Sequence, residues 1–329
     1  MLDTFLFACG AVLPIVLLIV LGYLLKRVRM LGEPLLSGLN RVCFRVLIPI
    51  LLFRNIYGGN GITPEDVRAV LFSTGVIAVA FVGGWCLVQA TIKRPNQKGV
   101  VLQAIFRSNF AVIGLPLATT LFGEAGARTA ALLSMITIPL FNVLAVIALS
   151  VFGADSGKKP SAGEVLRTII TNPLILGVIA GVIMLGLRGL FTQWGWTLRL
   201  TDIPGLYDAI DMAASAATPL ALLVLGGQFE LSAVRQLARP IAIGTIMRLI
   251  VVPVLGLSAA YLFFPDFGGA EYASFVSLFG TPTAVSSAVM ASEMGGDGEL
   301  AGQLVVWTTL GSAFTLFFFI ALLRAVGIF

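Results

Sequence analysis

Ten apolar stretches, each about as long as a membrane span, account for almost the whole chain. They cover residues 4–25, 34–56, 67–90, 99–122, 126–151, 165–187, 205–228, 238–263, 271–292 and 300–326. A helix needs about 20 apolar residues to cross the hydrocarbon core of a bilayer. Only 11% of the residues are charged, whereas soluble domains carry about 25%. The sequence therefore predicts an all-α membrane protein with ten transmembrane helices and no soluble domain.

Prolines recur in the same order in each half of the chain. The first half contains Pro14, Pro49 and Pro116, and the second contains Pro173, Pro219 and Pro282. The members of each pair are separated by about half of the 329 residues. Five spans per half is an odd number, so the two halves must cross the membrane in opposite directions, as in secondary transporters built from inverted repeats. We expect repeats at residues 1–152 and 165–329, joined by a linker at 153–164.

The fourth and ninth spans are predicted to be broken in mid-membrane. Each contains a Gly-x-Pro sequence, Gly114-Leu115-Pro116 and Gly280-Thr281-Pro282. Proline removes a backbone donor and clashes with the preceding helical turn, and glycine tolerates unwound backbone. We expect these residues to shape a substrate site where the two breaks meet. The N-terminal ends of half-helices carry partial positive charge, which suits an anion.

Basic residues in the predicted loops indicate the orientation of the chain. Eleven Lys and Arg residues fall in the loops that follow odd-numbered spans, and six fall in the other loops and near the termini. Cytoplasmic loops are enriched in Lys and Arg, so both termini are predicted to lie outside the cytoplasm. This asymmetry also accounts for most of the net charge of +5 without a nucleic-acid partner.

Histidine is absent and cysteine is rare. The chain has no His, and its three cysteines, Cys9, Cys43 and Cys86, all lie in predicted spans. We interpret these cysteines as small apolar residues, with no disulfide framework. We expect no metal and no organic cofactor. Any proton coupling would have to use a carboxylate, because His is the usual near-neutral proton carrier.

Polar side chains near the predicted breaks are candidates for contact with substrate. The amide of Asn109 can donate to a carboxylate. Asn142 and Ser286 lie near the expected crossing, and Arg45 lies one turn before Pro49, where it can attract an anion. These side chains and the positive helix ends together favour a negatively charged substrate.

Two further arginines and one asparagine lie inside predicted spans. Arg107 stands two residues before Asn109 and adds positive charge near the break. Arg248 lies five residues before Pro253, and we expect it to brace backbone carbonyls. Asn172 precedes Pro173, a pattern typical of a helix N-cap followed by proline at the first helical position.

Four short motifs resemble the auxin efflux carrier family, which includes plant auxin exporters and bacterial malonate and malate permeases. The motifs are Pro49-Ile50-Leu51-Leu52-Phe53, Gly114-Leu115-Pro116-Leu117-Ala118, Asn172-Pro173-Leu174-Ile175 and Thr218-Pro219-Leu220-Ala221-Leu222. The similarity extends over the whole chain. The long cytoplasmic loop of many plant members is missing, so the chain is most similar to the bacterial branch.

The resemblance implies the fold of bile-acid symporters and related antiporters. Spans 1, 2, 6 and 7 would form a scaffold that dimerises, and spans 3–5 and 8–10 would form a transport domain. The substrate would be a carboxylate such as malate, malonate or an auxin, bound where spans 4 and 9 cross. The transport domain would move against the scaffold in an elevator mechanism, in a bacterial inner membrane.

The sequence leaves three other functions open. Asp208 and Asp211 resemble half of the metal-binding acidic pair of a membrane prenyltransferase, but Glu293 is the only other intramembrane acid. A channel would need a filter motif, which the sequence does not show. A sodium symporter of the bile-acid type would need several oxygen ligands at the crossing. Residues that could supply them are Asn109, Thr281, Thr283 and Ser286.

Overall fold

The computed structural model describes residues 2–59, 67–153, 161–196 and 199–329, except for the side chains of residues 2–9, 11 and 162. The described chain is built from helices. These are α1 (Leu2–Arg27), α2 (Glu33–Val42), η1 (Cys43–Leu47), α3 (Ile48–Tyr57), α4 (Val67–Thr91), α5 (Pro95–Phe106), η2 (Phe110–Gly114), α6 (Leu115–Phe152), α7 (Ala162–Thr171), α8 (Pro173–Gln193), η3 (Leu200–Asp202), α9 (Leu206–Gln228), α10 (Ala233–Ile246), η4 (Met247–Val251), α11 (Val252–Phe263), α12 (Gly269–Gly280), α13 (Ser286–Glu293) and α14 (Gly298–Ala325). Most of the predicted linker at 153–164 lies outside the described residues, as does the side chain of Cys9.

Seven helical segments of the described chain are long and apolar enough to cross a membrane. They are Glu33–Tyr57, Val67–Thr91, Phe110–Phe152, Pro173–Gln193, Leu206–Gln228, Ala233–Phe263 and Gly298–Ala325. The predicted stretch at 165–187 differs, because α7 ends at Thr171 and a new helix, α8, begins at Pro173. Asn172 caps α8 as predicted, since its Oδ1 accepts from the Leu174 amide at 3.0 Å. The chain is a multi-pass membrane protein.

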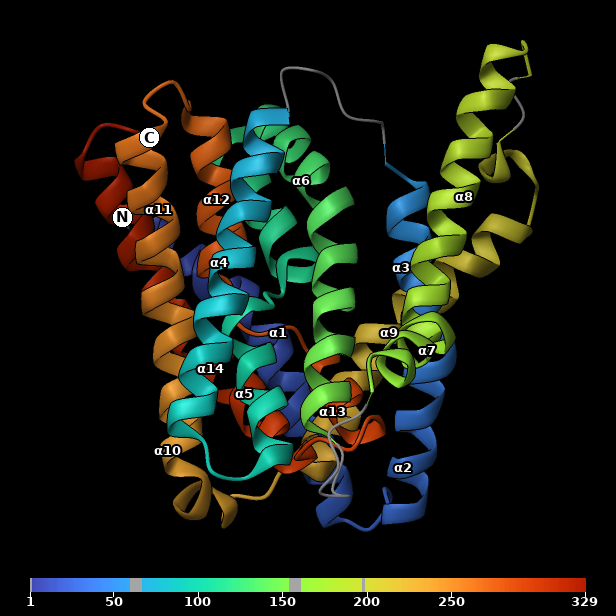
Figure 1. Ribbon diagram of the computed structural model, residues 1–329, viewed down its shortest axis with the longest axis vertical. Coiled ribbons are helices and arrows are strands. Elements are labelled where there is room, and N and C mark those ends of the chain that lie inside the picture. Colours follow the sequence, from blue (N-terminus) through green and yellow to red (C-terminus); the bar gives the residue numbers. More distant parts are fainter. Residues whose placement is uncertain (1, 60–66, 154–160, 197–198) are drawn as a thin grey trace.

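Helix α6 is two helices joined at a sharp bend. The backbone is non-helical at Phe122 and at Gly123, where φ is 57° and ψ is −142°. A positive φ favours glycine because it has no Cβ. The 38 residues of α6 would be far too long for one crossing. The bend therefore lets the chain run to one end of the molecule and back again (Figure 1).

The first helix break was predicted at Pro116, but it lies earlier in the chain, at residues 107–109. Helix α5 ends at Phe106, and Arg107 (φ −92°, ψ 110°) and Asn109 (φ −83°, ψ 47°) are non-helical. Pro116 instead stands second in α6, directly after the π-helical turn η2. The wider π turn accommodates the proline ring, which would clash with the carbonyl of a regular turn. Pro49 after η1 and Pro253 after η4 have the same arrangement.

The second break lies at the predicted position, around Pro282, and the two breaks are joined. Helix α12 ends at Gly280 and α13 begins at Ser286. Ser108 and Thr283 form an isolated antiparallel bridge, and the Asn109 amide donates to the Pro282 carbonyl oxygen at 2.7 Å. Each broken helix thus supplies hydrogen-bond partners for backbone groups that the break in the other helix leaves unpaired. Backbone groups inside a membrane need such partners, because no water is available there.

Arg248 holds the ends of α5 and α12 together. The side chain is 1% exposed. It donates to the carbonyl oxygens of Ile105, Phe106, Leu278, Phe279 and Thr281. These carbonyls end two half-helices, where partial negative charge accumulates. The expectation that Arg248 braces backbone carbonyls is confirmed.

Glycines allow close contact between two pairs of helices, α1 with α9 and α3 with α8. A Cβ added to Gly22 of α1 would overlap the carbonyl oxygen of Leu223 in α9. A Cβ added to Gly181 of α8 would lie 3.2 Å from the carbonyl oxygen of Phe53 in α3. Small residues that let backbones approach are typical of membrane helix packing.

Replacing Gly22 by alanine should destabilise the protein, because α1 and α9 must separate to make room for the methyl group. Overpacking of this kind costs about 1–3 kcal/mol. The control is Gly83→Ala on α4, where an added Cβ has no neighbour within 4 Å and alanine is the better helix former. Thermal unfolding in detergent should show a lower midpoint for Gly22→Ala and an unchanged or higher one for Gly83→Ala. Equal midpoints would contradict the tight α1–α9 contact.

Candidate functional site

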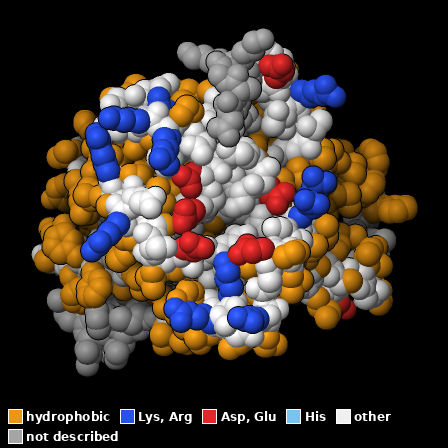
Figure 2. All heavy atoms as spheres, turned by 90° about the horizontal axis from the view of Figure 1, so that it is seen from below, with side chains coloured by type: hydrophobic (Ala, Val, Ile, Leu, Met, Phe, Trp, Pro, Cys, Tyr) orange, Lys and Arg blue, Asp and Glu red, His pale blue; other side chains and the backbone are white. Residues whose placement is uncertain are grey.

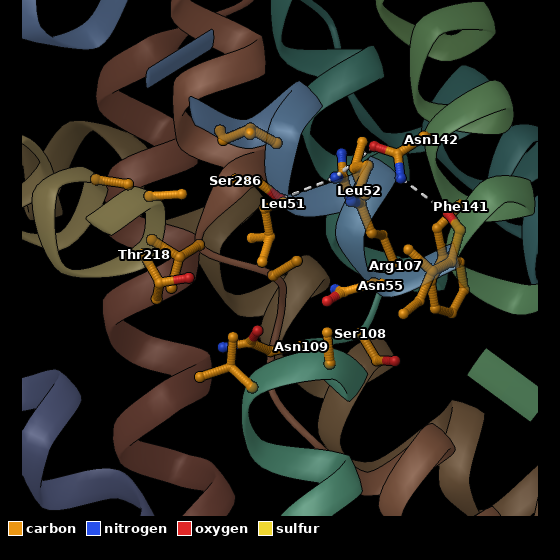
Figure 3. A pocket seen from close by; sticks show the side chains of 18 residues that line it. Leu51, Leu52, Asn55, Arg107, Ser108, Asn109, Phe141, Asn142, Thr218 and Ser286 are labelled. Carbon is orange, nitrogen blue, oxygen red and sulfur yellow. Dashed lines mark hydrogen bonds between the residues drawn. The ribbon is translucent and has the colours of Figure 1, made fainter. Parts of the chain in front are cut away.

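A small pocket lies where the two broken helices cross (Figure 3). Its volume is about 70 Å³, enough for a small molecule only. The walls come from α3, the break between α5 and η2, α6, α9, and the break between α12 and α13. The lining residues are Ile48, Leu51, Leu52, Asn55, Arg107, Ser108, Asn109, Ala111, Val112, Ile138, Phe141, Asn142, Ala217, Thr218, Ala221, Ala284, Val285 and Ser286. Most of this wall is apolar, so its few polar groups decide what the pocket can bind.

Arg107 contributes the only charged side chain among those lining residues. It is 3% exposed. Its Nη2 donates to Asn142 Oδ1 at 3.0 Å and to Ser286 Oγ at 2.8 Å, and its Nη1 faces the sulfur of Met290. Figure 3 shows the guanidinium between Asn142 and Ser286. All of these partners are neutral, and no described carboxylate forms an ion pair with Arg107. A buried charge without a counter-charge is costly unless a ligand supplies one.

Asn109 supplies an unused donor in another part of the same pocket wall (Figure 3). The residue is 4% exposed, and its Nδ2 has no hydrogen-bond partner among the described residues. The same holds for the buried Ser108 hydroxyl. Buried polar groups are nearly always satisfied, so orphaned groups in a pocket indicate a ligand that completes them. An amide donor and a guanidinium both suit an anionic oxygen.

The four half-helix ends at the crossing are arranged by sign. The C-terminal ends of α5 and α12 meet Arg248, whereas the N-terminal ends of η2 and α13 supply Ala111, Val112 and Ser286 to the pocket. Each helix end is equivalent to about half a unit charge. Arg248 therefore offsets the negative ends, while the positive ends add to the charge of Arg107. The pocket carries an excess of positive charge equivalent to about two units.

The structure brings some of the predicted site residues together and leaves others outside the pocket. Asn109, Asn142 and Ser286 line it. Gly114 and Gly280 instead pack against neighbouring helices, since added Cβ atoms would lie 3.0 Å from the Ser277 carbonyl oxygen of α12 and 2.9 Å from Leu316 Cδ2 of α14.

The remaining predicted residues serve the breaks or point elsewhere. Thr281 and Pro282 contribute carbonyl oxygens, accepting from Arg248 and Asn109 respectively, and Pro116 lies within α6. Arg45 does not line the pocket, and its side chain is exposed. Arg45 lies in the π turn η1, whose residue spacing differs from that of the regular helix assumed in counting one turn back from Pro49.

Sequence reasoning placed Arg107 near the break but not in the pocket, and it missed Ser108, Asn55 and Thr218. Arg107 had a usable signal, because a charged residue inside an apolar span is costly and defaults to a functional role. Asn55 had none, since it lies at the end of a span. In the structure Asn55 Oδ1 accepts from Arg54 at 3.4 Å, and Arg54 pairs with Asp211 at 2.8 Å.

These contacts bear on the two alternatives that named particular residues. Asp211, from the acidic pair that suggested an enzyme, is paired with Arg54, so it lies in a structural ion pair. Ser286, one of the oxygens that could hold sodium, accepts a hydrogen bond from the Arg107 guanidinium at 2.8 Å. A fixed positive charge at this distance repels a cation. The arrangement favours an anion over sodium.

The fold and the pocket define a multi-pass membrane protein with a buried, positively charged site at a crossing of broken helices. A family model described as "Membrane transport protein" matches residues 7–162 and 158–320. The chain belongs to this family, which is the auxin efflux carrier family indicated by the motifs. The description of this family assigns it to membrane transport.

Curated relatives cover most of the chain at low identity. An "Uncharacterized transporter" of Methanothermobacter thermautotrophicus is 24% identical over 308 residues, covering 93% of this chain and 95% of its own. A protein of Rhizobium meliloti named "Putative malonate transporter" is 29% identical over 332 residues, covering 96% of both chains. The "Uncharacterized transporter YfdV" of Escherichia coli K12 is 24% identical over 253 residues, covering 75% of this chain and 76% of its own.

Proposed function

We propose that this protein is a secondary transporter that moves a small organic carboxylate across the bacterial inner membrane. One observation carries the proposal: Arg107 is buried in the crossing pocket with only neutral partners. The orphaned amide of Asn109 lies in the same pocket. Anionic oxygens of a ligand that spans the pocket would satisfy both groups with charge-assisted hydrogen bonds.

The same pocket favours small substrates with high charge density. The positive excess, equivalent to about two unit charges, suits a dicarboxylate better than a monocarboxylate. The name of the Rhizobium relative makes malonate the first compound to test, with malate and an auxin beside it.

The membrane topology we propose is ten spans in two inverted five-helix repeats. The contacts of α1 with α9 and of α3 with α8 support it, because a two-fold axis that exchanges the halves also exchanges these pairs. The two broken helices, α5–η2–α6 and α12–α13, occupy corresponding places in the two halves. Gly22 and Gly181, each eight residues after a paired proline, both lie at these close helix contacts.

For the mechanism, we propose that a transport domain moves as one body against a scaffold. Spans 1, 2, 6 and 7 form the scaffold, and spans 3–5 and 8–10 form the transport domain. Support comes from the links inside the second group, which include Arg248, the bridge between Ser108 and Thr283, and the hydrogen bond from Gln97 to Asp297 at 2.9 Å. A rigid group of this kind suits an elevator-type movement.

We also propose that both termini lie outside the cytoplasm and that the scaffold forms a homodimer. The two ends of the chain lie in the same half of the molecule (Figure 1). The opposite end, shown in Figure 2, has a rim of Lys and Arg around a group of acidic residues. This distribution supports a cytoplasmic position for that end. The dimer is implied by the family alone.

Binding and transport by purified protein in liposomes test the proposed function. We expect malonate or another dicarboxylate to raise the melting temperature and to exchange across the membrane with saturable kinetics. The panel should include monocarboxylates, a neutral sugar and an organic cation. Tight binding of the sugar or the cation, with no carboxylate bound, would overturn the proposal. A current that does not saturate would indicate a channel.

Asn109→Ala should weaken carboxylate binding by about one to two orders of magnitude, because a hydrogen bond to a charged group contributes roughly 1.5–3 kcal/mol. Its side chain makes no other hydrogen bond from Nδ2, so folding should be little affected. Asn109→Asp is the matched variant, since it keeps the shape but adds repulsion. Calorimetric titration with the best ligand of the panel measures both. Unchanged affinity in Asn109→Asp would exclude contact between residue 109 and the anion.

A further inference from the structure

Helix α13 begins at the pocket, with Ser286, and ends beside α2, with Glu293. It has eight residues, and its side chains at Ser286, Met290 and Glu293 follow the i, i+4, i+7 spacing that places them on one face. Arg107 contacts the first two of these residues. The third, Glu293, lies two turns away from the pocket, at the C-terminal end of α13.

Glu293 accepts a hydrogen bond from the other side of the proposed domain boundary. Its Oε1 accepts from Asn40 Nδ2 at 3.0 Å. Asn40 belongs to α2 and is 3% exposed. A buried amide rarely goes without a partner, so Asn40 favours the arrangement in which α13 is close to α2.

Few polar contacts otherwise cross between the proposed scaffold and transport domain. Among the described residues, Asn172 Nδ2 lies 3.5 Å from the sulfur of Met294, and Gln303 donates to the carbonyl of Glu230 in the turn between α9 and α10. Asn40–Glu293 is the contact that involves a carboxylate. A mostly apolar boundary can slide, whereas a buried hydrogen bond to a carboxylate resists separation.

We propose that the Asn40–Glu293 hydrogen bond is a latch that holds α13 against α2 and keeps the pocket closed toward the end of the molecule where Glu293 lies. Asn40 and Glu293 are positioning residues in this role, because neither touches the pocket. The inference rests on the proposed movement of one domain against the other. An anion that accepts hydrogen bonds from Arg107 would replace Ser286 as a partner of the guanidinium and loosen the first turn of α13. Helix α13 would transmit this change to the Asn40–Glu293 hydrogen bond.

A reporter cysteine in the pocket tests the latch without any substrate. Ala221 lines the pocket from α9, and Ala221→Cys would be made in a background in which Cys9, Cys43 and Cys86 are replaced by alanine. Protein in liposomes of defined orientation is treated with a membrane-impermeant maleimide from either side. Asn40→Ala and Glu293→Ala should raise the rate of modification from the Glu293 side about fivefold, as expected when one hydrogen bond no longer biases a two-state equilibrium.

Three variants separate the latch from a general loss of structure. Glu293→Gln keeps an acceptor oxygen but loses the charge, so its rate should lie between the original rate and that of Glu293→Ala. Ser292→Ala is the control on the same helix, since its hydroxyl donates only to Ala288 of α13, at 3.1 Å. The Asn40→Ala/Glu293→Ala double variant should react no faster than either single variant. Original rates in both single variants, or additive effects in the double variant, would overturn the latch.

The result is independent of the substrate assignment. If no carboxylate binds the protein but the two single variants open the pocket, the proposed function fails and the latch stands. If carboxylates are transported but the latch variants leave the modification rate unchanged, the latch fails and the proposed function stands.

Discussion

Arg107→Met should weaken carboxylate binding by orders of magnitude while leaving the unliganded protein at least as stable as before. Binding loses the one charged group of the pocket. Removing one partner of a buried charge pair costs about 2–5 kcal/mol or more, which weakens affinity by roughly one and a half to three and a half orders of magnitude. Stability should not fall, because a buried charge with only neutral partners is replaced by an apolar chain of similar length. Such exchanges are often neutral or stabilising.

Melting temperature with and without ligand measures both effects in one experiment. Arg107→Met should show an unchanged or higher midpoint without ligand and no increase when ligand is added. Arg45→Met is the control, since Arg45 is exposed and does not line the pocket, and it should respond to ligand normally. A strong loss of stability in Arg107→Met would show that the charge is structural and would remove the main support for an anion site.

Arg248→Met should have the opposite effect and should severely destabilise the fold. This side chain satisfies carbonyl oxygens at the ends of two helices, and no water is available inside a membrane to replace it. Leaving buried acceptors without partners costs about 1–3 kcal/mol each. We expect a total loss of about 3–5 kcal/mol, as for a broken buried charge network.

The yield of folded protein and its resistance to denaturant provide the measurement for Arg248→Met. Arg239→Met is the matched control, since Arg239 lies on α10 in the same helical run but is exposed. Arg248→Lys should recover little, because an ammonium has three donors and no planar fork with which to reach carbonyls of two helices. Normal stability in Arg248→Met would mean that other groups cap α5 and α12.

Local chemistry alone was enough to predict several features. Apolar stretches such as 67–90 became helices with almost the same bounds, in this case Val67–Thr91. The break at Pro282, the N-cap at Asn172 and the bracing role of Arg248 were also predicted. In each case the decisive cause lies within a few residues: span length, a missing amide donor, or a charge that has to find polar partners inside a membrane.

Tertiary structure decided where the first break lies and which side chains form the pocket. Pro116 did not break its helix, because the wider π turn that precedes it leaves room for the proline ring. The change from α-helical to π-helical hydrogen bonding that makes this room leaves no pattern in the sequence. Arg107 meets Ser286 across 179 residues of chain. Two arginines that look alike in sequence thus have opposite roles: Arg248 meets carbonyl ends that neutralise it, and Arg107 meets only neutral side chains. The groups that long-range packing brings next to a buried charge therefore determine its role. The charge stabilises the fold where these groups neutralise it, and it is available to bind a ligand where they do not.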